Sequence, residues 1–271
     1  MVQDGAHGGR RRLLRGAMLA AAGAGVGAAA FAELADAADR HLPIRGGAAS
    51  ATVADRRRHP GAAQLCVRWH VECDQKLVAL TFDDGPRPQW TDVVLDILHR
   101  HGAPATLFTV GRRVRKYARV LAGRVGRHEV ANHSWDHRDL ARMDADEVYE
   151  DLRRTHDAIG EVTGQTARLV RPPYGHLGGS TLLAASRLGY EVVLWSGQML
   201  ESEYPDDPAG HAAYVVAQAE PGAILLAHDT GPPDRLVAIR GLPDMITGMR
   251  SRGFEFVTVS ELLAAAHPGA A

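Results

Sequence analysis

Two adjacent carboxylates, Asp83 and Asp84, follow a short apolar run at residues 77–80 and precede a glycine and a proline. The run predicts a buried strand, and the Gly-Pro pair predicts the turn that ends it. In α/β folds the carboxyl end of such a strand faces the ligand crevice or the barrel mouth. One carboxylate there could bind a cation while the other moves a proton, although a purely structural Asp-Gly-Pro turn fits the same residues.

Two histidines four residues apart, His133 and His137, follow another predicted strand at residues 128–133. If the chain turns helical there, both imidazoles lie on one face, which is a common arrangement for two ligands of a divalent metal such as zinc. With Asp84 they would supply three ligands and leave a position open for water, as a catalytic zinc site requires. Two structural histidines are the alternative, because the chain contains 14 of them.

Two further strand ends carry groups suited to proton chemistry. Arg171 opens an RPPYG segment, and its permanent charge could hold Asp83 in place and ionised. The two prolines stiffen that segment, so a backbone N–H after them can be aimed rigidly at a cavity. His228 ends a predicted strand, where it could act as a general acid with Leu225 or Leu226 as an apolar wall. Taken alone, each segment also fits a structural role.

The elements that position these residues alternate in type from residue 77 onward. The alternation predicts about seven β/α units, hence an α/β fold with a parallel barrel or an open doubly wound sheet. Predicted strands cover residues 77–82, 105–110, 128–133, 167–172, 191–196, 223–228 and 254–259, and predicted helices cover 91–100, 114–124, 144–159, 180–188, 208–219 and 236–252. No glycine-rich phosphate loop follows the first strand, so nothing indicates nucleotide binding.

Composition sets the outer limits. With 271 residues, 45% of them hydrophobic, the chain can bury one large core. Its net charge of −1 does not indicate nucleic acid or an anionic membrane as a partner.

The first residues differ in kind from the rest. Arginines at positions 10–12 and 15, an Ala/Gly-rich stretch and small residues near Ala35 and Ala37 predict a twin-arginine-like signal peptide over residues 1–37. The protein is then exported and is extracellular or cell-wall associated, and an uncleaved N-terminal membrane anchor is the alternative. Residues 38–63, rich in Ala, Gly, Arg and Pro, are predicted to be a linker before a catalytic domain at 64–271.

Cys66 and Cys73 are the only cysteines of the chain. In an exported protein such a pair can close a small loop, so we predict a disulfide across a hairpin made by residues 67–72. Two free buried thiols are the alternative. A metal site is disfavoured because no further ligands lie nearby in the sequence.

Four motifs occur in the order TFDDGP, NHSWDH, RPPYG and LLAH. Together they resemble the polysaccharide deacetylase family, the NodB homology domain of the carbohydrate esterases, over about residues 76–263. The family fold is a distorted barrel of parallel strands and helices, in agreement with the predicted units. The resemblance implies an exported, metal-dependent hydrolase that removes N-acetyl groups from N-acetylglucosamine-containing polysaccharide, such as peptidoglycan or a chitin-like glycan. We expect a glycan substrate, a monomer and no stable membrane insertion.

The resemblance also implies roles for the residues that move protons or line the pocket. Asp83 matches the general base, Arg171 the residue that holds that base, and His228 the general acid that protonates the leaving amine. The backbone N–H of Tyr174 matches a donor to the oxyanion, and Leu226 matches the wall of the pocket for the acetyl methyl group. Asp83 would deprotonate water for attack on the acetamide carbonyl, with no covalent enzyme intermediate.

For the metal, the resemblance implies Asp84, His133 and His137 as ligands, with Zn²⁺ the expected ion and Co²⁺ the alternative. Hydrolysis of an O-acetyl ester or of another amide would use the same residues. A catalytically silent protein that binds cell-wall glycan is a further alternative, and the intact ligands and proton-transfer residues argue against it.

One segment departs from the family pattern. After Trp195 the family has an acid-rich stretch ending in Asp-Trp that lines the pocket and tunes the acid histidine, whereas this chain has Gln198 and Glu201 and no second tryptophan. Glu201 or Glu203 could replace the missing acid, and the sequence does not decide between them.

Overall fold

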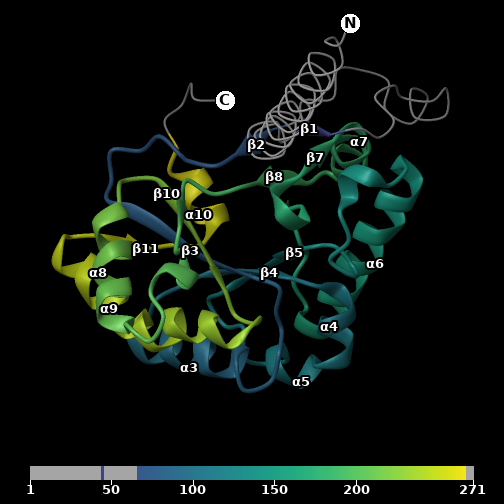
Figure 1. Cartoon of the computed structure of the whole chain (residues 1–271). Coiled ribbons are helices and arrows are strands. Elements are labelled where there is room, and N and C mark those ends of the chain that lie inside the picture. The colour runs from purple at the N-terminus through teal and green to yellow at the C-terminus, as the bar shows by residue number, and fades with distance from the viewer. Residues whose placement is uncertain (1–43, 46–65, 267–271) are drawn as a thin grey trace, which may run out of the picture. The chain divides into compact units, whose positions relative to one another are not determined.

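The computed structural model describes residues 44–45 and 66–266 (Figure 1). The predicted signal peptide and most of the predicted linker lie outside these residues. Within the range predicted as linker, β1 (Ile44–Arg45) pairs in parallel with β7 (Leu177–Gly178).

One parallel sheet carries the other strands. They are β2 (Val67–Arg68), β3 (Leu77–Asp83), β4 (Thr106–Thr109), β5 (Glu129–Asn132), β6 (Leu169–Val170), β8 (Glu191–Val193), β9 (Gly197–Gln198), β10 (Ala223–His228) and β11 (Glu255–Phe256). The order is β2-β8-β6-β5-β4-β3-β10-β9, and β11 joins the start of β3. Among the described residues no pairing joins β2 to β9, so the sheet curls without closing. The prediction of a distorted parallel α/β barrel is confirmed.

Helices surround the sheet (Figure 1), and all but the last connect its strands, whereas the last follows β11 and packs against β3. They are α3 (Thr91–His101), α4 (Gly111–Lys116), α5 (Ala118–Leu121), α6 (Ala145–Thr163), α7 (Gly179–Leu188), α8 (Pro208–Gln218), α9 (Leu236–Ser251) and α10 (Val259–Ala264). The helix predicted over residues 114–124 is two short helices separated at Tyr117. None of the helices described here has the length and apolar character needed to cross a membrane.

Local sequence explains the longest helix and the central strand. α6 begins after Asp144, whose side chain and that of Glu147 form a reciprocal capping box, and it ends at Gly164 with φ 73°. Every residue of β3 is buried, because the sheet covers this strand on both edges and side chains pack on both faces. The seven strands predicted from residue 77 onward are all present.

The predicted disulfide is wrong in this structure, where Cys66 and Cys73 are both free. The hairpin that would have brought them together does not form, because β2 pairs in parallel with the distant strand β8 and His70 pairs with Ala223. The Cys73 thiol instead lies 3.4 Å from the backbone oxygen of Gln75.

Strand register brings the chemically suited residues to one edge. His228 at the end of β10 pairs directly with Asp83 at the end of β3. At the end of β5, Asn132 pairs with Val170 of β6, so the next residue of each strand, His133 and Arg171, leaves the sheet at the same level. Because all these strands are parallel, their carboxyl ends meet at one edge.

Candidate active site

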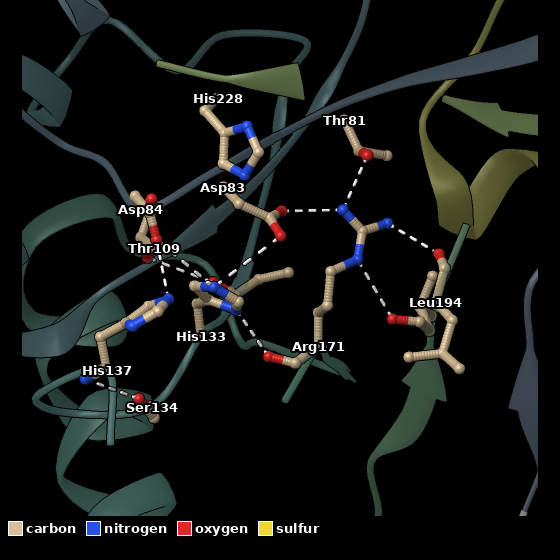
Figure 2. Close-up of polar contacts among 12 residues, drawn as sticks. Thr81, Asp83, Asp84, Thr109, His133, Ser134, His137, Arg171, Leu194 and His228 are labelled. Carbon is tan, nitrogen blue, oxygen red and sulfur yellow. Dashed lines mark hydrogen bonds and ion pairs between the residues drawn. The ribbon is translucent and has the colours of Figure 1, made fainter. Parts of the chain in front are cut away.

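Asp83 and Arg171 form a buried ion pair at the centre of the site (Figure 2). Arg171 Nη1 donates to Asp83 Oδ1 at 2.7 Å, and the two side chains are 0% and 5% exposed. The remaining donors of Arg171 reach Thr81 Oγ1 at 2.8 Å and the carbonyl oxygens of Val193 and Leu194 at 3.2 and 2.8 Å. Every branch of this guanidinium therefore has an acceptor, which fixes the orientation of the Asp83 carboxylate.

Asp84, His133 and His137 converge beside that pair. Asp84 Oδ1 lies 3.0 Å from His137 Nε2 and 3.6 Å from His133 Nε2, and the three ligand atoms all lie within 4.8 Å of one another. Tetrahedral ligands at about 2.0–2.1 Å from a zinc ion are separated by roughly 3.3 Å. The spacing of these atoms therefore fits one divalent metal ion, as the sequence predicted.

The backbone oxygen of Arg171 fixes the orientation of one of these imidazoles. It lies 2.6 Å from His133 Nδ1, which assigns the proton to Nδ1 and leaves the Nε2 lone pair facing Asp84 (Figure 2). A histidine that ligates a metal through Nε2 needs this tautomer. Arg171 thus supports two functions, through its side chain to Asp83 and through its main chain to His133.

A loop, not the helix considered from the sequence, presents the two histidines. Residues 133–139 have no helical assignment, and both Ser134 and His137 have positive φ, at 66° and 60°. The Ser134 hydroxyl accepts a hydrogen bond from the backbone N–H of His137 at 2.9 Å. The ring centroids of His133 and His137 are 5.0 Å apart. The observed loop therefore brings the two imidazoles together, as the helix considered from the sequence would have done.

The charges of the cluster are coupled. Burial by itself would raise the pKa of Asp84, but hydrogen bonds and charges from His133 and His137 outweigh it and place that pKa far below its usual range. Burial likewise opposes protonation of His133, and the charges of Asp83 and Asp84 outweigh it and raise the pKa of this imidazole. The cluster therefore attracts positive charge, which is the condition for cation binding.

His228 ends β10, directly beside Asp83 at the end of β3, and has a carboxylate partner. Its Nδ1 lies 3.1 Å from Glu201 Oε1, and both side chains are largely buried. Burial alone would raise the pKa of Glu201, but the hydrogen bond and charge of His228 outweigh it and lower the pKa. Glu203 is exposed, so the structure selects Glu201 as the acid that the sequence left undecided.

Sequence reasoning missed Arg235, which lies in the turn after β10. Its Nη1 donates to Asp84 Oδ2 at 2.9 Å and to the backbone oxygen of Thr230 at 3.0 Å. Arg235 thus occupies the second oxygen of the Asp84 carboxylate and leaves Oδ1 directed at the histidines. Its place in a GPPDR turn gave no signal of this contact.

Asp229, next to His228, is another residue that the sequence did not single out. It is 2% exposed, and its Oδ2 accepts a hydrogen bond from Thr91 Oγ1 at 2.6 Å. Burial and the charges of Asp84 and Asp83 raise the pKa of Asp229 to about 7. Its carboxylate also fills the space beside Gly85, where a Cβ would clash with Oδ2.

A cavity of about 110 Å³ joins these groups. Besides the charged residues, its walls include Tyr174, Gly175, Trp195 and Leu226. Leu226 is 4% exposed, whereas the Tyr174 ring is 60% exposed and lies edge-on to His137 at 4.8 Å between centroids. All eight predicted site residues therefore line this cavity or, for Arg171, contact a residue that does.

Comparisons with known proteins agree with this geometry. A family model described as polysaccharide deacetylase matches residues 70–193. A peptidoglycan-N-acetylglucosamine deacetylase of Bacillus cereus is 34% identical over 203 residues, which cover 74% of this chain and 94% of that protein. The peptidoglycan-N-acetylmuramic acid deacetylase PdaC of Bacillus subtilis is 34% identical over 194 residues, 71% of this chain but only 40% of its own length.

A solved structure is similar as well. The family 4 acetyl xylan esterase of Clostridium thermocellum, in complex with a cobalt ion, is 32% identical, with a TM-score of 0.64. The match covers 69% of this chain and 90% of that one.

Proposed function

The chain belongs to the polysaccharide deacetylase family of hydrolases, and from that premise we propose that it removes N-acetyl groups from N-acetylglucosamine-containing glycan in a metal-dependent reaction. One observation carries the proposal. Asp83 and His228, a base and an acid, stand on directly paired residues of β3 and β10 and open into one cavity with a three-ligand cluster. Metal-assisted hydrolysis of an amide uses these three components together.

Asp84, His133 and His137 would hold the metal, most simply zinc, with cobalt as the second choice. A bound divalent ion would supply Lewis-acid polarisation of the acetamide carbonyl and would lower the pKa of water. Arg235 keeps Asp84 Oδ2 engaged, and the backbone oxygen of Arg171 keeps the His133 lone pair directed at the cluster.

Asp83 is the base that takes the proton from the attacking water. Its Oδ1 is engaged by Arg171, so Oδ2 is the oxygen available for the proton, and Oδ2 lies 3.8 Å from His133 Nε2 on the side of the ligand cluster. Because Arg171 is buried and hydrogen-bonded through all three of its guanidinium nitrogens, Asp83 needs no reorganisation during the reaction.

His228 is the acid that gives a proton to the leaving nitrogen. Glu201 accepts from Nδ1, which orients the ring so that Nε2 faces the substrate and which stabilises the imidazolium. The backbone N–H of Tyr174 would donate to the oxyanion, and Leu226 with Trp195 would enclose the acetyl methyl group. The reaction releases acetate and leaves a free amine on the sugar.

The relatives support cell-wall glycan as the substrate class, because their names refer to peptidoglycan. The arginine-rich, Ala/Gly-rich first 37 residues support export, which places the enzyme on the outer side of the cytoplasmic membrane. Cell fractionation with an antibody against the folded domain tests this location.

The activity test measures acetate release by the full-length chain, stripped of metal and then given zinc or cobalt. The substrates are an N-acetylglucosamine oligomer, purified peptidoglycan and acetylated xylan. The variants are Asp83→Asn and His133→Ala, with His99→Ala, an exposed histidine on α3, as the matched control. We expect metal-dependent release from the amino sugars, a loss of at least 100-fold in both site variants, and full activity in the control.

Release from acetylated xylan alone would assign the protein to ester hydrolysis. If no substrate reacts although one equivalent of metal binds, deacetylation of these glycans is excluded. If metal fails to bind, the ligand assignment itself is wrong.

A further inference from the structure

A second cavity, of about 290 Å³, is lined by Arg87, Arg112, Arg113, Lys116 and Tyr117. We refer to it as the basic cavity, because four of its five side chains are cationic. Arg87, Arg112 and Lys116 are exposed and Arg113 is half-buried. None of these residues belongs to the motifs that match the family, and none lines the catalytic cavity.

The basic cavity borders the metal-ligand loops. Arg113 Nη1 donates to the backbone oxygen of Asp84 at 2.6 Å. Arg112 Nε lies 3.3 Å from the carboxylate of Asp136, the residue before His137. Because β3 and β4 are parallel neighbours, the turn that carries Arg87 and the helix α4 leave the same edge of the sheet. The basic cavity therefore lies on the substrate-facing side of the fold, next to the catalytic cavity.

Positive charge in the basic cavity exceeds its local compensation. Within the described part of the chain, no carboxylate lies within ion-pairing distance of the Arg87 or Lys116 side chain, and each instead faces an aromatic ring, that of Trp90 or Tyr117, at 5.9 and 5.2 Å. Converging like charges cost free energy unless an anion binds between them.

Arginine side chains recognise carboxylates and phosphates through paired donors. On the proposed function, a long polymer lies over this edge while one of its acetamides enters the catalytic cavity. Neutral polymers such as chitin or unsubstituted xylan have no anionic group that could pair with the basic cavity. A peptidoglycan strand carries free carboxylates on its peptides, or on the lactyl group where the peptide is absent, one sugar away from each N-acetylglucosamine.

We propose that the basic cavity is a substrate subsite that binds a carboxylate of the glycan, so that the enzyme selects an acidic, muramyl-containing polymer over neutral ones. This inference rests on the proposed deacetylase function and names its substrate class. Charge recognition at this subsite also raises the association rate, which falls as salt rises.

The test compares a muropeptide-bearing glycan oligomer with an N-acetylglucosamine oligomer of equal length. The full-length, zinc-loaded protein is measured beside the triple variant R87Q/R112Q/K116Q and beside R119Q, an exposed arginine on α5 that does not line the cavity. We expect wild type and R119Q to prefer the acidic glycan in kcat/KM, and the triple variant to lose about 10-fold or more of that preference through KM. Raising NaCl from 20 to about 500 mM should reduce the preference of wild type in the same way.

Direct binding separates this inference from the proposed function. Calorimetric titration of the metal-free protein with the same two oligomers requires no turnover. Affinity for the acidic oligomer that is lost in the triple variant and kept in R119Q supports the subsite even if no acetate is released. Equal affinity of wild type and triple variant for the acidic oligomer would overturn it. Binding of a phosphodiester wall polymer, but not of the acidic glycan, would also overturn the assignment to a substrate carboxylate.

Discussion

Replacing Arg171 with methionine should destabilise the fold severely, as well as stop catalysis. Arg171 is 0% exposed and its guanidinium lies 4.1 Å from the Phe108 ring centroid, so methionine fills much of the apolar part of the site. The substitution leaves the buried Asp83 carboxylate without its cation and the carbonyl oxygens of Val193 and Leu194 without their donor.

Breaking a buried ion pair by removing one partner costs about 3–5 kcal/mol. For a folded region of roughly 200 residues, each kcal/mol lowers the midpoint of thermal unfolding by about 2–4 °C. The midpoint of thermal unfolding should therefore fall by roughly 6–20 °C. A double variant that also carries Asp83→Asn no longer buries an unpaired charge, so the cost of R171M should be smaller in that background by about 1–3 kcal/mol.

The free energy of unfolding is measured by urea titration of the metal-stripped full-length protein, and the midpoint of thermal unfolding by heating it. Circular dichroism follows both transitions. Metal is omitted because binding to the folded state adds its own stabilisation. Arg119→Met, on the surface of α5, is the matched control and should stay within about 0.5 kcal/mol of wild type. The idea that this pair holds Asp83 in place would be refuted if R171M lowers the free energy of unfolding by less than about 1 kcal/mol. It would also be refuted if R171M costs the same in the wild-type and Asp83→Asn backgrounds.

Three further predictions concern other titratable groups. Glu201→Gln should lower kcat about 10-fold or more with little change in KM, because His228 loses the partner that orients its ring, whereas exposed Glu203→Gln should leave kcat unchanged. Burial lowers the pKa of His128 to about 4, so the free energy of unfolding should fall by up to about 3 kcal/mol as the pH drops from 6.5 to 4. His128→Gln should remove this fall in urea titrations at successive pH values. The pKa of Asp229 is raised to about 7, so the metal-free protein should lose stability as pH rises from about 4 to 7, and Asp229→Asn should flatten that slope in the same titrations.

Local sequence was sufficient wherever a site residue ends a central strand. Asp83, Arg171 and His228 each end or follow a short segment whose composition predicts a strand, and parallel strands bring their carboxyl ends together. The capping box of α6 was equally local, since Asp144 and Glu147 are three residues apart. These predictions needed no knowledge of which strands are neighbours.

Pairings between distant segments could not be predicted in the same way. Choosing Glu201 over Glu203 depends on a turn in which Leu200 adopts φ 47°, and this turn directs only the first glutamate towards His228. Arg235 reaches Asp84 across 151 positions of sequence, and nothing in its turn indicates the partner. The predicted disulfide failed for the same reason, because β2 is held by β8 and not by the residues that follow it.

The family match and the geometry support different halves of the site. Residues 70–193 contain the proposed base, the proposed metal ligands and Arg171, but they end before His228, Glu201 and Arg235. His228 ends β10 and pairs directly with Asp83, Arg235 lies in the turn after β10, and Glu201 lies in the turn between β9 and α8. A chain cut after residue 193 would also lose β10, one of the two strands that flank β3 at the site, so the base itself would be left at an open edge. The proposed proton delivery by His228 and the rigid support of Asp83 thus depend on the same strand pair, and the C-terminal segment is as much part of the candidate active site as the motifs that identify the family.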